Sequence, residues 1–200
     1  HDGMDICILS SALNQSKYDL IIENYFDKIS KKDGITSLNT AFSSEGSFIH
    51  IPKNVQVDKP IQVIYFSTGK NESVFYQPRN LIIVGENSQV EIIERHQSLS
   101  ENSVLVNSVS EIYCDIRSVV KHYKIQNDKT NASLIDNTFV SQERNSDYSL
   151  HTFSLGGELT RNNLSIIQNG ERIESTINGI TIIGANQHVD HNTLIHHKKP

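Results

Sequence analysis

The chain has 200 residues, of which 36% are hydrophobic and 20% are charged, a composition that allows one globular domain with a sizeable core. Its net charge of −5 argues against a nucleic-acid-binding surface, because the basic runs are limited to residues 31–32 and 198–199. The longest apolar run, residues 81–84, is far too short to span a membrane, and the first ten residues lack the pattern of a signal peptide. We therefore expect a soluble cytoplasmic protein that binds neither nucleic acid nor a membrane.

Residues 1–45 form the first predicted unit, a helical and connecting segment. Apolar side chains recur there at helical spacing and predict one stripe on an amphipathic helix: Tyr18, Ile21, Ile22, Tyr25, Phe26 and Ile29. Ser16 is suited to cap the start of this helix, and Gly34, just after Lys32, is suited to end it. The following stretch "TSLNTAFSSEG" predicts one or two further helical turns.

From Phe48 onward the pattern changes to short strands separated by polar corners. Runs such as "SFIHIPKNVQV" and "RNLIIVGENSQVEIIERHQ" alternate polar and apolar residues and are bounded by Gly, Asn, Asp or Ser. The chain holds 19 asparagines and 10 glycines, residue types that tolerate the left-handed backbone of tight corners. Residues 46–200 are therefore predicted to form an all-β, right-handed parallel β-helix, incomplete at its C-terminal end; an antiparallel sandwich is the alternative.

The interior of this β-helix is predicted to be lined by aliphatic residues from the alternating runs. The candidates are Ile49, Ile51, Val63, Ile83, Ile92, Ile112, Ile125, Ile166 and Ile182.

The closing stretch "GANQHVDHNTLIHHKKP" holds four of the nine histidines and is the strongest candidate site. On a strand, His188 and Asp190 point to one face and His191 to the other, because successive side chains alternate. Imidazoles and carboxylates bind metals, so these three residues are the candidate metal ligands. One face supplies at most two of them, and we expect no tightly bound metal; a solvated or interface-facing strand is the favoured interpretation. The upstream histidines are single and widely spaced: His96, His122 and His151.

Motifs of catalysis are missing from the sequence. It contains no glycine-rich phosphate loop, no GxSxG elbow and no HExxH helix. Cys7 and Cys114 lie far apart, form no CxxC pair and are interpreted as buried, reduced thiols. Arg161, followed by Asn162 and Asn163, predicts an asparagine ladder between coils. We therefore predict no catalytic residue and no enzymatic activity.

The stretch "GGELTRNNLSIIQNGERIESTINGITIIGANQHVDHNTLIHHKKP" resembles the core of the SufB/SufD family of the SufBCD iron–sulfur cluster assembly complex. Its "RNNL" and "HVDHNT" are nearer to the SufD branch than to the SufB branch. "TSLNTAF", "IHIPKNVQVDKPIQV" and "RNLIIVGENSQVEIIE" resemble successive segments of the same family. The resemblance therefore covers nearly the whole chain.

This resemblance implies a right-handed parallel β-helix that acts as a non-catalytic scaffold. The implied partners are a SufB-like subunit and a SufC-like ATPase, the latter bound through C-terminal helices missing here, and a homodimer is left open. The resemblance implies no cofactor in this fragment, since the full complex handles the cluster. The family's interface histidine lies in a Cys-Ser-His-Gly segment that this chain lacks, so that role does not pass to the closing histidines.

A carbohydrate-active or carbohydrate-binding β-helix protein is the alternative function. Enzymes of that class use carboxylates gathered on one face. Here the carboxylates are scattered over predicted corners, as at Glu86, Glu101 and Asp147, and the chain has no tryptophan to stack on sugars. The scaffold is the favoured function.

Overall fold

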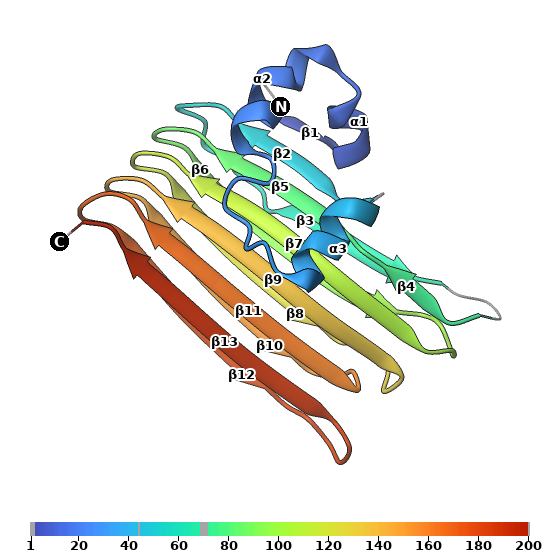
Figure 1. Ribbon diagram of the computed structural model, residues 1–200. Coiled ribbons are helices and arrows are strands. Elements are labelled where there is room, and N and C mark those ends of the chain that lie inside the picture. Colours follow the sequence, from blue (N-terminus) through green and yellow to red (C-terminus); the bar gives the residue numbers. More distant parts are fainter. Residues whose placement is uncertain (1–2, 44, 69–71, 200) are drawn as a thin grey trace.

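The computed structural model describes residues 3–43, 45–68 and 72–199. The larger sheet has eight strands in the order β1-β2-β5-β7-β9-β11-β13, with β4 paired to β7, and Figure 1 shows these strands side by side. Its strands are β1 (Asp5–Ile8), β2 (Ser47–Ile51), β4 (Val74–Tyr76), β5 (Arg79–Val84), β7 (Val104–Cys114), β9 (Ala132–Gln142), β11 (Leu159–Gln168) and β13 (His188–His197).

The second sheet has five strands in the order β12-β10-β8-β6-β3 and lies behind the first in Figure 1. Its strands are β3 (Ile61–Ser67), β6 (Gln89–Ser98), β8 (Val119–Gln126), β10 (Asp147–Ser154) and β12 (Glu174–Thr181).

The two sheets are the walls of one solenoid. The chain passes from one sheet to the other and back over about five turns. All strand pairs are parallel except β1 with β2. Contacting side chains on neighbouring coils are 26 residues apart for Asn137 and Asn163 but 33 apart for Ser47 and Asn80, so the repeat is uneven. The predicted parallel β-helix is confirmed, and the antiparallel sandwich is excluded.

One corner of each turn contains a residue with left-handed backbone. These residues have φ between 54° and 63° and each joins a strand of the larger sheet to the next strand of the smaller one: Asn54, Asn87, Arg117, Asn145 and Arg172. Asparagine adopts this conformation at low cost, because its short polar side chain bonds locally. The asparagine-rich composition therefore serves the corners, as predicted.

Apolar side chains fill much of the space between the sheets. Five predicted interior residues are at most 1% exposed there, and Val63 packs against the same cluster. They are Ile49, Ile51, Ile92, Ile112 and Ile166. Removal of this area from water is the main stabilising contribution to the coils.

Three predicted interior residues lie elsewhere. Ile83 is buried outside the solenoid, in the cluster beneath the N-terminal segment, while its neighbour Ile82 points inward. Ile125 is only partly buried on β8, and Ile182 follows β12 and is 65% exposed. Alternation cannot tell the two faces of a strand apart when both carry apolar residues, as both do on β5.

The N-terminal segment packs on the outer face of the eight-stranded sheet (Figure 1). It contains α1 (Leu9–Leu13), η1 (Ser16–Tyr18), α2 (Asp19–Tyr25) and α3 (Gly34–Phe42). The predicted apolar stripe is confirmed in that its side chains join those of β2 and β5 in one cluster. The stripe residues in it are Tyr18, Ile21, Ile22, Tyr25 and Phe26. In the described residues no helix is long and apolar enough to cross a membrane.

The predicted helix over residues 16–32 is too long. Helix α2 ends at Tyr25, and Asp27 has a φ of 59°, which no helix accommodates. Gly34 does not end this helix but begins α3, whose N-cap is Asp33. The further helical turns predicted after Gly34 are confirmed by α3.

A buried carboxylate explains the early end of α2. Glu111 on β7 accepts hydrogen bonds from the backbone N–H groups of Asp27, Ile29 and Ser30, at 2.8, 3.1 and 3.2 Å. The same carboxylate lies 2.5 Å from Nη2 of Arg79, and both side chains are fully buried. Charge-assisted bonds of this kind are stronger than the helical bonds they replace. The loop after α2 is therefore fixed on the solenoid.

Candidate functional site

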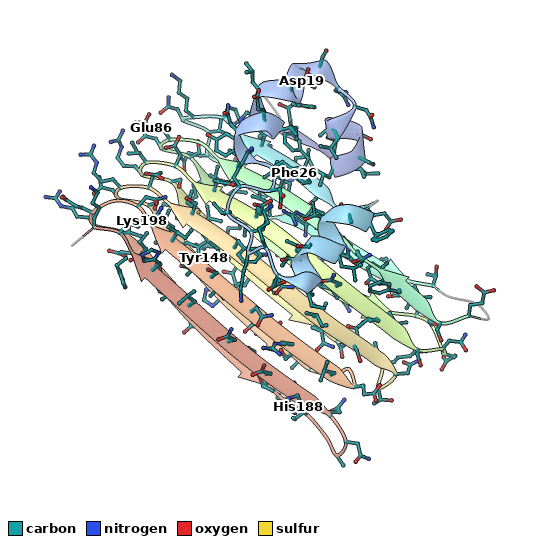
Figure 2. The ribbon with its side chains drawn as sticks, in the orientation of Figure 1. Asp19, Phe26, Glu86, Tyr148, His188 and Lys198 are labelled. Atoms are coloured by element: carbon teal, nitrogen blue, oxygen red, sulfur yellow. The ribbon has the colours of Figure 1, made fainter. Side chains whose placement is uncertain are left out.

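The closing histidines lie on β13, as predicted. This strand pairs in parallel with β11, with His188 opposite Leu159 and Asp190 opposite Arg161. Figure 2 shows His188 at one end of β13 and Lys198 beyond its other end.

The structure directs Asp190 and His191 to opposite faces of the strand. On the outer face, Oδ2 of Asp190 lies 3.4 Å from Nε of Arg161. The ring nitrogens of His191 lie 3.4 Å from Nδ2 of Asn162 and 3.1 Å from Oγ1 of Thr181. His188 is exposed. The three candidate ligands are therefore not brought together, and two of them already have protein partners.

Residues 3–43, 45–68 and 72–199 contain no group of three or more His, Cys, Asp or Glu side chains placed to hold a metal ion. Weak metal binding by His188, Asp190 and His191 stays a prediction. Calorimetric titration with Fe²⁺ and Zn²⁺ tests it against the double variant His188→Ala, Asp190→Ala.

A cluster of ionisable side chains occupies part of the solenoid interior. The carboxylate of Glu94 lies 3.0 Å from Nε2 of His96 and 3.2 Å from Nε2 of His122. Lys124 lies 3.6 Å from Glu94 and donates to both carboxylate oxygens of Asp136, at 2.6 and 2.7 Å. All five residues are at most 8% exposed.

Two tyrosines extend this cluster. The hydroxyl of Tyr148 lies 3.1 Å from Nδ1 of His122, so both ring nitrogens of that histidine have partners. The ring of Tyr65 stacks on His96 with 4.8 Å between centroids, and its hydroxyl donates to Asn80. The hydrogen bonds thus reach from β10 through β8 and β6.

The charges in the cluster stabilise one another. Burial acts to raise the pKa of Glu94, but Lys124 and hydrogen bonds from both histidines outweigh it and hold this pKa well below its usual range. Burial acts to lower the pKa of Lys124, but Asp136 and Glu94 outweigh it, and this pKa is raised. Burial lowers the pKa of His122 despite its hydrogen bond to Glu94. At neutral pH the cluster therefore holds an ionised Glu94 and Lys124 beside a neutral His122.

The interpretation of His96 and His122 as isolated residues was wrong. Parallel stacking places Ile92 opposite His122 and Glu94 opposite Lys124, so residues about one coil apart meet in the interior. The available signal was the polar residue at every second position of two successive strands. Without the register between coils, that signal does not say which positions face each other.

The predicted asparagine ladder is present on the outer face. Nε of Arg161 donates to Oδ1 of Asn163 at 3.3 Å, and Nδ2 of Asn163 donates to Oδ1 of Asn137 at 2.9 Å. Asn162 points inward instead, since its amide meets Ser154 and His191. The ladder thus links β9 and β11 by one residue from each strand.

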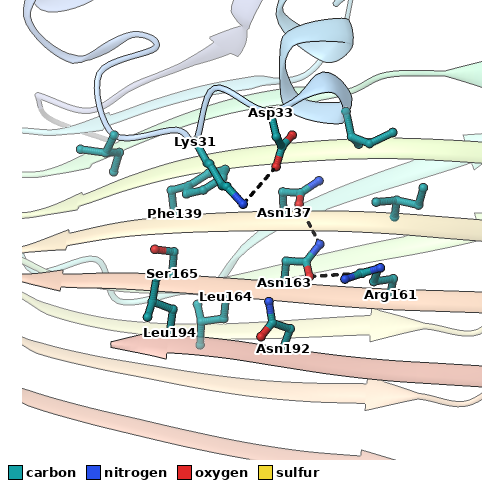
Figure 3. Close-up of a pocket in the computed structure, with 13 residues that line it drawn as sticks. Lys31, Asp33, Asn137, Phe139, Arg161, Asn163, Leu164, Ser165, Asn192 and Leu194 are labelled. Atoms are coloured by element: carbon teal, nitrogen blue, oxygen red, sulfur yellow. Dashed lines mark hydrogen bonds and ion pairs between the residues drawn. The ribbon is translucent and has the colours of Figure 1, made fainter. Parts of the chain in front are cut away.

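A groove with a volume of about 580 Å³ lies over this ladder, between residues 29–35 and the outer face of β9, β11 and β13. Figure 3 shows Lys31 and Asp33 above the ladder residues Asn137, Asn163 and Arg161. The apolar residues of its lining are Ile29, Ile35, Ile135, Phe139, Leu164 and Leu194.

The two cysteines are both free. Cys114 is buried in the solenoid, as predicted, and burial raises the pKa of its thiol. Cys7 is only partly buried, beneath the N-terminal segment.

Two family models match successive parts of the chain. Residues 2–63 match the SufBD protein N-terminal region. Residues 65–200 match the SufBD core domain of the SUF system for FeS cluster assembly. The second match contains all but one of the coils described above.

Individual relatives agree with these matches. An iron–sulfur cluster assembly SufBD family protein of Synechocystis is 30% identical over 86% of this chain and 40% of its own length. The chloroplastic protein ABCI7 of Arabidopsis thaliana is 30% identical over 74% of this chain and 33% of its own. A SufBD family protein of Staphylococcus epidermidis is 29% identical over 95% of this chain and 41% of its own. The chain thus spans less than half the length of these relatives.

Proposed function

This chain belongs to the SufBD family of iron–sulfur cluster assembly proteins, and on that premise we propose that it is a non-catalytic scaffold subunit of the SufD type. In this proposal it pairs with a SufB-like subunit and, through further helices of the assembled complex, with a SufC-like ATPase. The iron–sulfur cluster is cargo of that complex. The two free cysteines favour the reducing cytoplasm as its location.

The observation that carries the proposal is the family match across the whole solenoid. The last coil supports it, because within the described residues β13 pairs only with β11 and β12 only with β10. Ile177 and Ile195 on this coil are 39% and 37% exposed. Open strand edges beside apolar side chains are suited to pairing with further strands. We divide the chain at residue 45, since α3 ends at Phe42 and β2 begins at Ser47.

Co-expression tests the proposal. The protein at its natural length is produced with the SufB-like and SufC-like proteins of the same cell, and the purified material is analysed by size-exclusion chromatography with mass measurement. A stoichiometric complex of all three supports the proposal. A homodimer that excludes both partners, or retention on polysaccharide without complex formation, contradicts it and favours the carbohydrate-binding alternative.

The absence of turnover is tested separately. We expect no ATP hydrolysis by the purified chain, because its sequence has no phosphate-binding loop. Hydrolysis in a sample free of SufC-like protein contradicts the scaffold role.

A further inference from the structure

The asparagine ladder leaves one hydrogen-bond donor without a partner in the groove. Arginine can only donate, so Asn163 must turn its oxygen to Arg161 and its Nδ2 to the oxygen of Asn137. This fixes the orientation of Asn137 and leaves its Nδ2 over β7, where the residue in register is the apolar Val109. Nδ2 of Asn137 is buried and has no partner, and the residue is only 5% exposed.

An unpaired buried donor indicates a ligand that brings an acceptor. Leaving such a group unpaired costs about 1–3 kcal/mol, so most buried donors in proteins are paired. Asn137 lines a groove whose volume of about 580 Å³ lies in the range of ligand sites. The ligand therefore carries an oxygen that accepts from this amide.

The charges around the groove show that this oxygen is neutral. Lys31 lies 3.9 Å from Asp33, and Arg161 lies 3.4 Å from Asp190, so each cation has a carboxylate beside it. A carboxylate ligand on Asn137 would also meet the fixed charge of Asp33, whose Oδ1 accepts from the N–H of Thr36 at the start of α3. A carbonyl oxygen avoids this repulsion.

Apolar residues on both sides of Asn137 define the rest of the ligand. Ile135 and Phe139 lie two positions before and after it on β9 and line the same groove. Side chains two positions apart on a strand are separated by about 7 Å, as are those of any extended chain lying along it. An extended polypeptide can therefore set apolar side chains on Ile135 and Phe139 with a main-chain carbonyl between them.

From these contacts we propose that the groove binds an uncharged, apolar segment of polypeptide in extended form, with a main-chain carbonyl accepting from Nδ2 of Asn137. Leu194 of β13, which is 61% exposed, extends the apolar lining to the edge of the sheet. The groove binds such a segment whether or not the chain pairs with the partner subunits proposed above.

The test is nuclear magnetic resonance titration of the protein at its natural length with a capped, uncharged heptapeptide of alternating leucine and serine. We expect saturable shifts of the Asn137 side-chain amide signals. The variant Asn137→Asp keeps the size of the side chain and the acceptor for Asn163 but removes the free donor. It should weaken binding by about tenfold, the effect of one well-formed hydrogen bond.

Asn178→Asp, on the five-stranded sheet, is the matched control and should bind the peptide as the natural protein does. Two results overturn the proposal: peptide binding that is equal in Asn137→Asp and the natural protein, or no binding at millimolar peptide. Octanoate is titrated in parallel. If it binds at Asn137 more tightly than the peptide, the groove is a carboxylate site and the polypeptide is ruled out.

Discussion

Arg79 and Glu111 connect the N-terminal segment to the solenoid through a pair of fully buried charges. Arg79 also lies 3.2 Å from Asp27, and its guanidinium stacks on Phe26 at 5.2 Å from the ring centroid. A buried pair is strongly destabilising when one partner is lost, because the remaining charge is left without its counterpart. The loop after α2 depends on the same carboxylate.

We expect Glu111→Gln to lower the free energy of unfolding by about 3 kcal/mol, measured by urea denaturation. Limited proteolysis should then cut the loop between α2 and α3. Glu91→Gln is the control, since Glu91 pairs with Lys121 at the surface and its loss should cost about 1 kcal/mol or less. Equal losses in the two variants would contradict the role given to burial.

The interior cluster predicts how stability depends on pH. The folded protein holds His122 with a lowered pKa, so the unfolded chain binds its proton more readily. The stabilisation from this group is fully present above the unfolded pKa of about 6.5 and is lost as the pH falls through the folded value. Glu94, whose pKa is also lowered, adds a second loss below about pH 4.5.

The free energy of unfolding should therefore decrease from pH 7 to pH 5. In His122→Gln, which cannot take up the proton, that decrease should be smaller. His151→Gln is the control, since His151 stacks on Tyr123 and is only partly buried on the five-stranded sheet. Chemical denaturation at a series of pH values measures both. An unchanged slope in His122→Gln would show that another group carries the pH dependence.

Single elements differ in how well the sequence predicts them. The strands and their corners follow from local alternation and local turn residues, so the β-helix was predictable from Phe48 onward. The end of α2 was not, because the groups that stop it accept from Glu111, which is 84 residues away from Asp27. The interior cluster and the groove depend on the register between coils, which the uneven repeat conceals.

The corners offer a prediction at the level of single turns. Arg172 has a φ of 54°, a conformation that costs most side chains about 1 kcal/mol or more but costs asparagine less. Arg172→Asn should therefore raise the free energy of unfolding by about 0.5–1 kcal/mol, measured by urea denaturation. Arg144→Asn changes an exposed arginine at the preceding corner whose φ is not positive, and should give no gain.

As a whole, the molecule is a row of coils in which each contacts only its neighbours. Stability in such an array is a sum of coil and nearest-neighbour contributions, so local opening should begin at the last coil. Strands β12 and β13 each pair on one side only within the described residues, whereas β8 and β9 pair on both. Amide hydrogen exchange should therefore be at least about tenfold faster in β12 and β13 than in β8 and β9.

Ile166→Ala tests whether the coils open as neighbours do. Ile166 on β11 is fully buried, and removing its side chain should cost about 2–5 kcal/mol. In a row of coils this loss should speed amide exchange in β11, β12 and β13 while β6 and β8 keep their protection. Val90→Ala on β6, also fully buried, is the counterpart and should speed exchange in β3, β6 and β8 instead. If either variant accelerates exchange uniformly over all strands, the solenoid unfolds as one cooperative unit and the additive description fails.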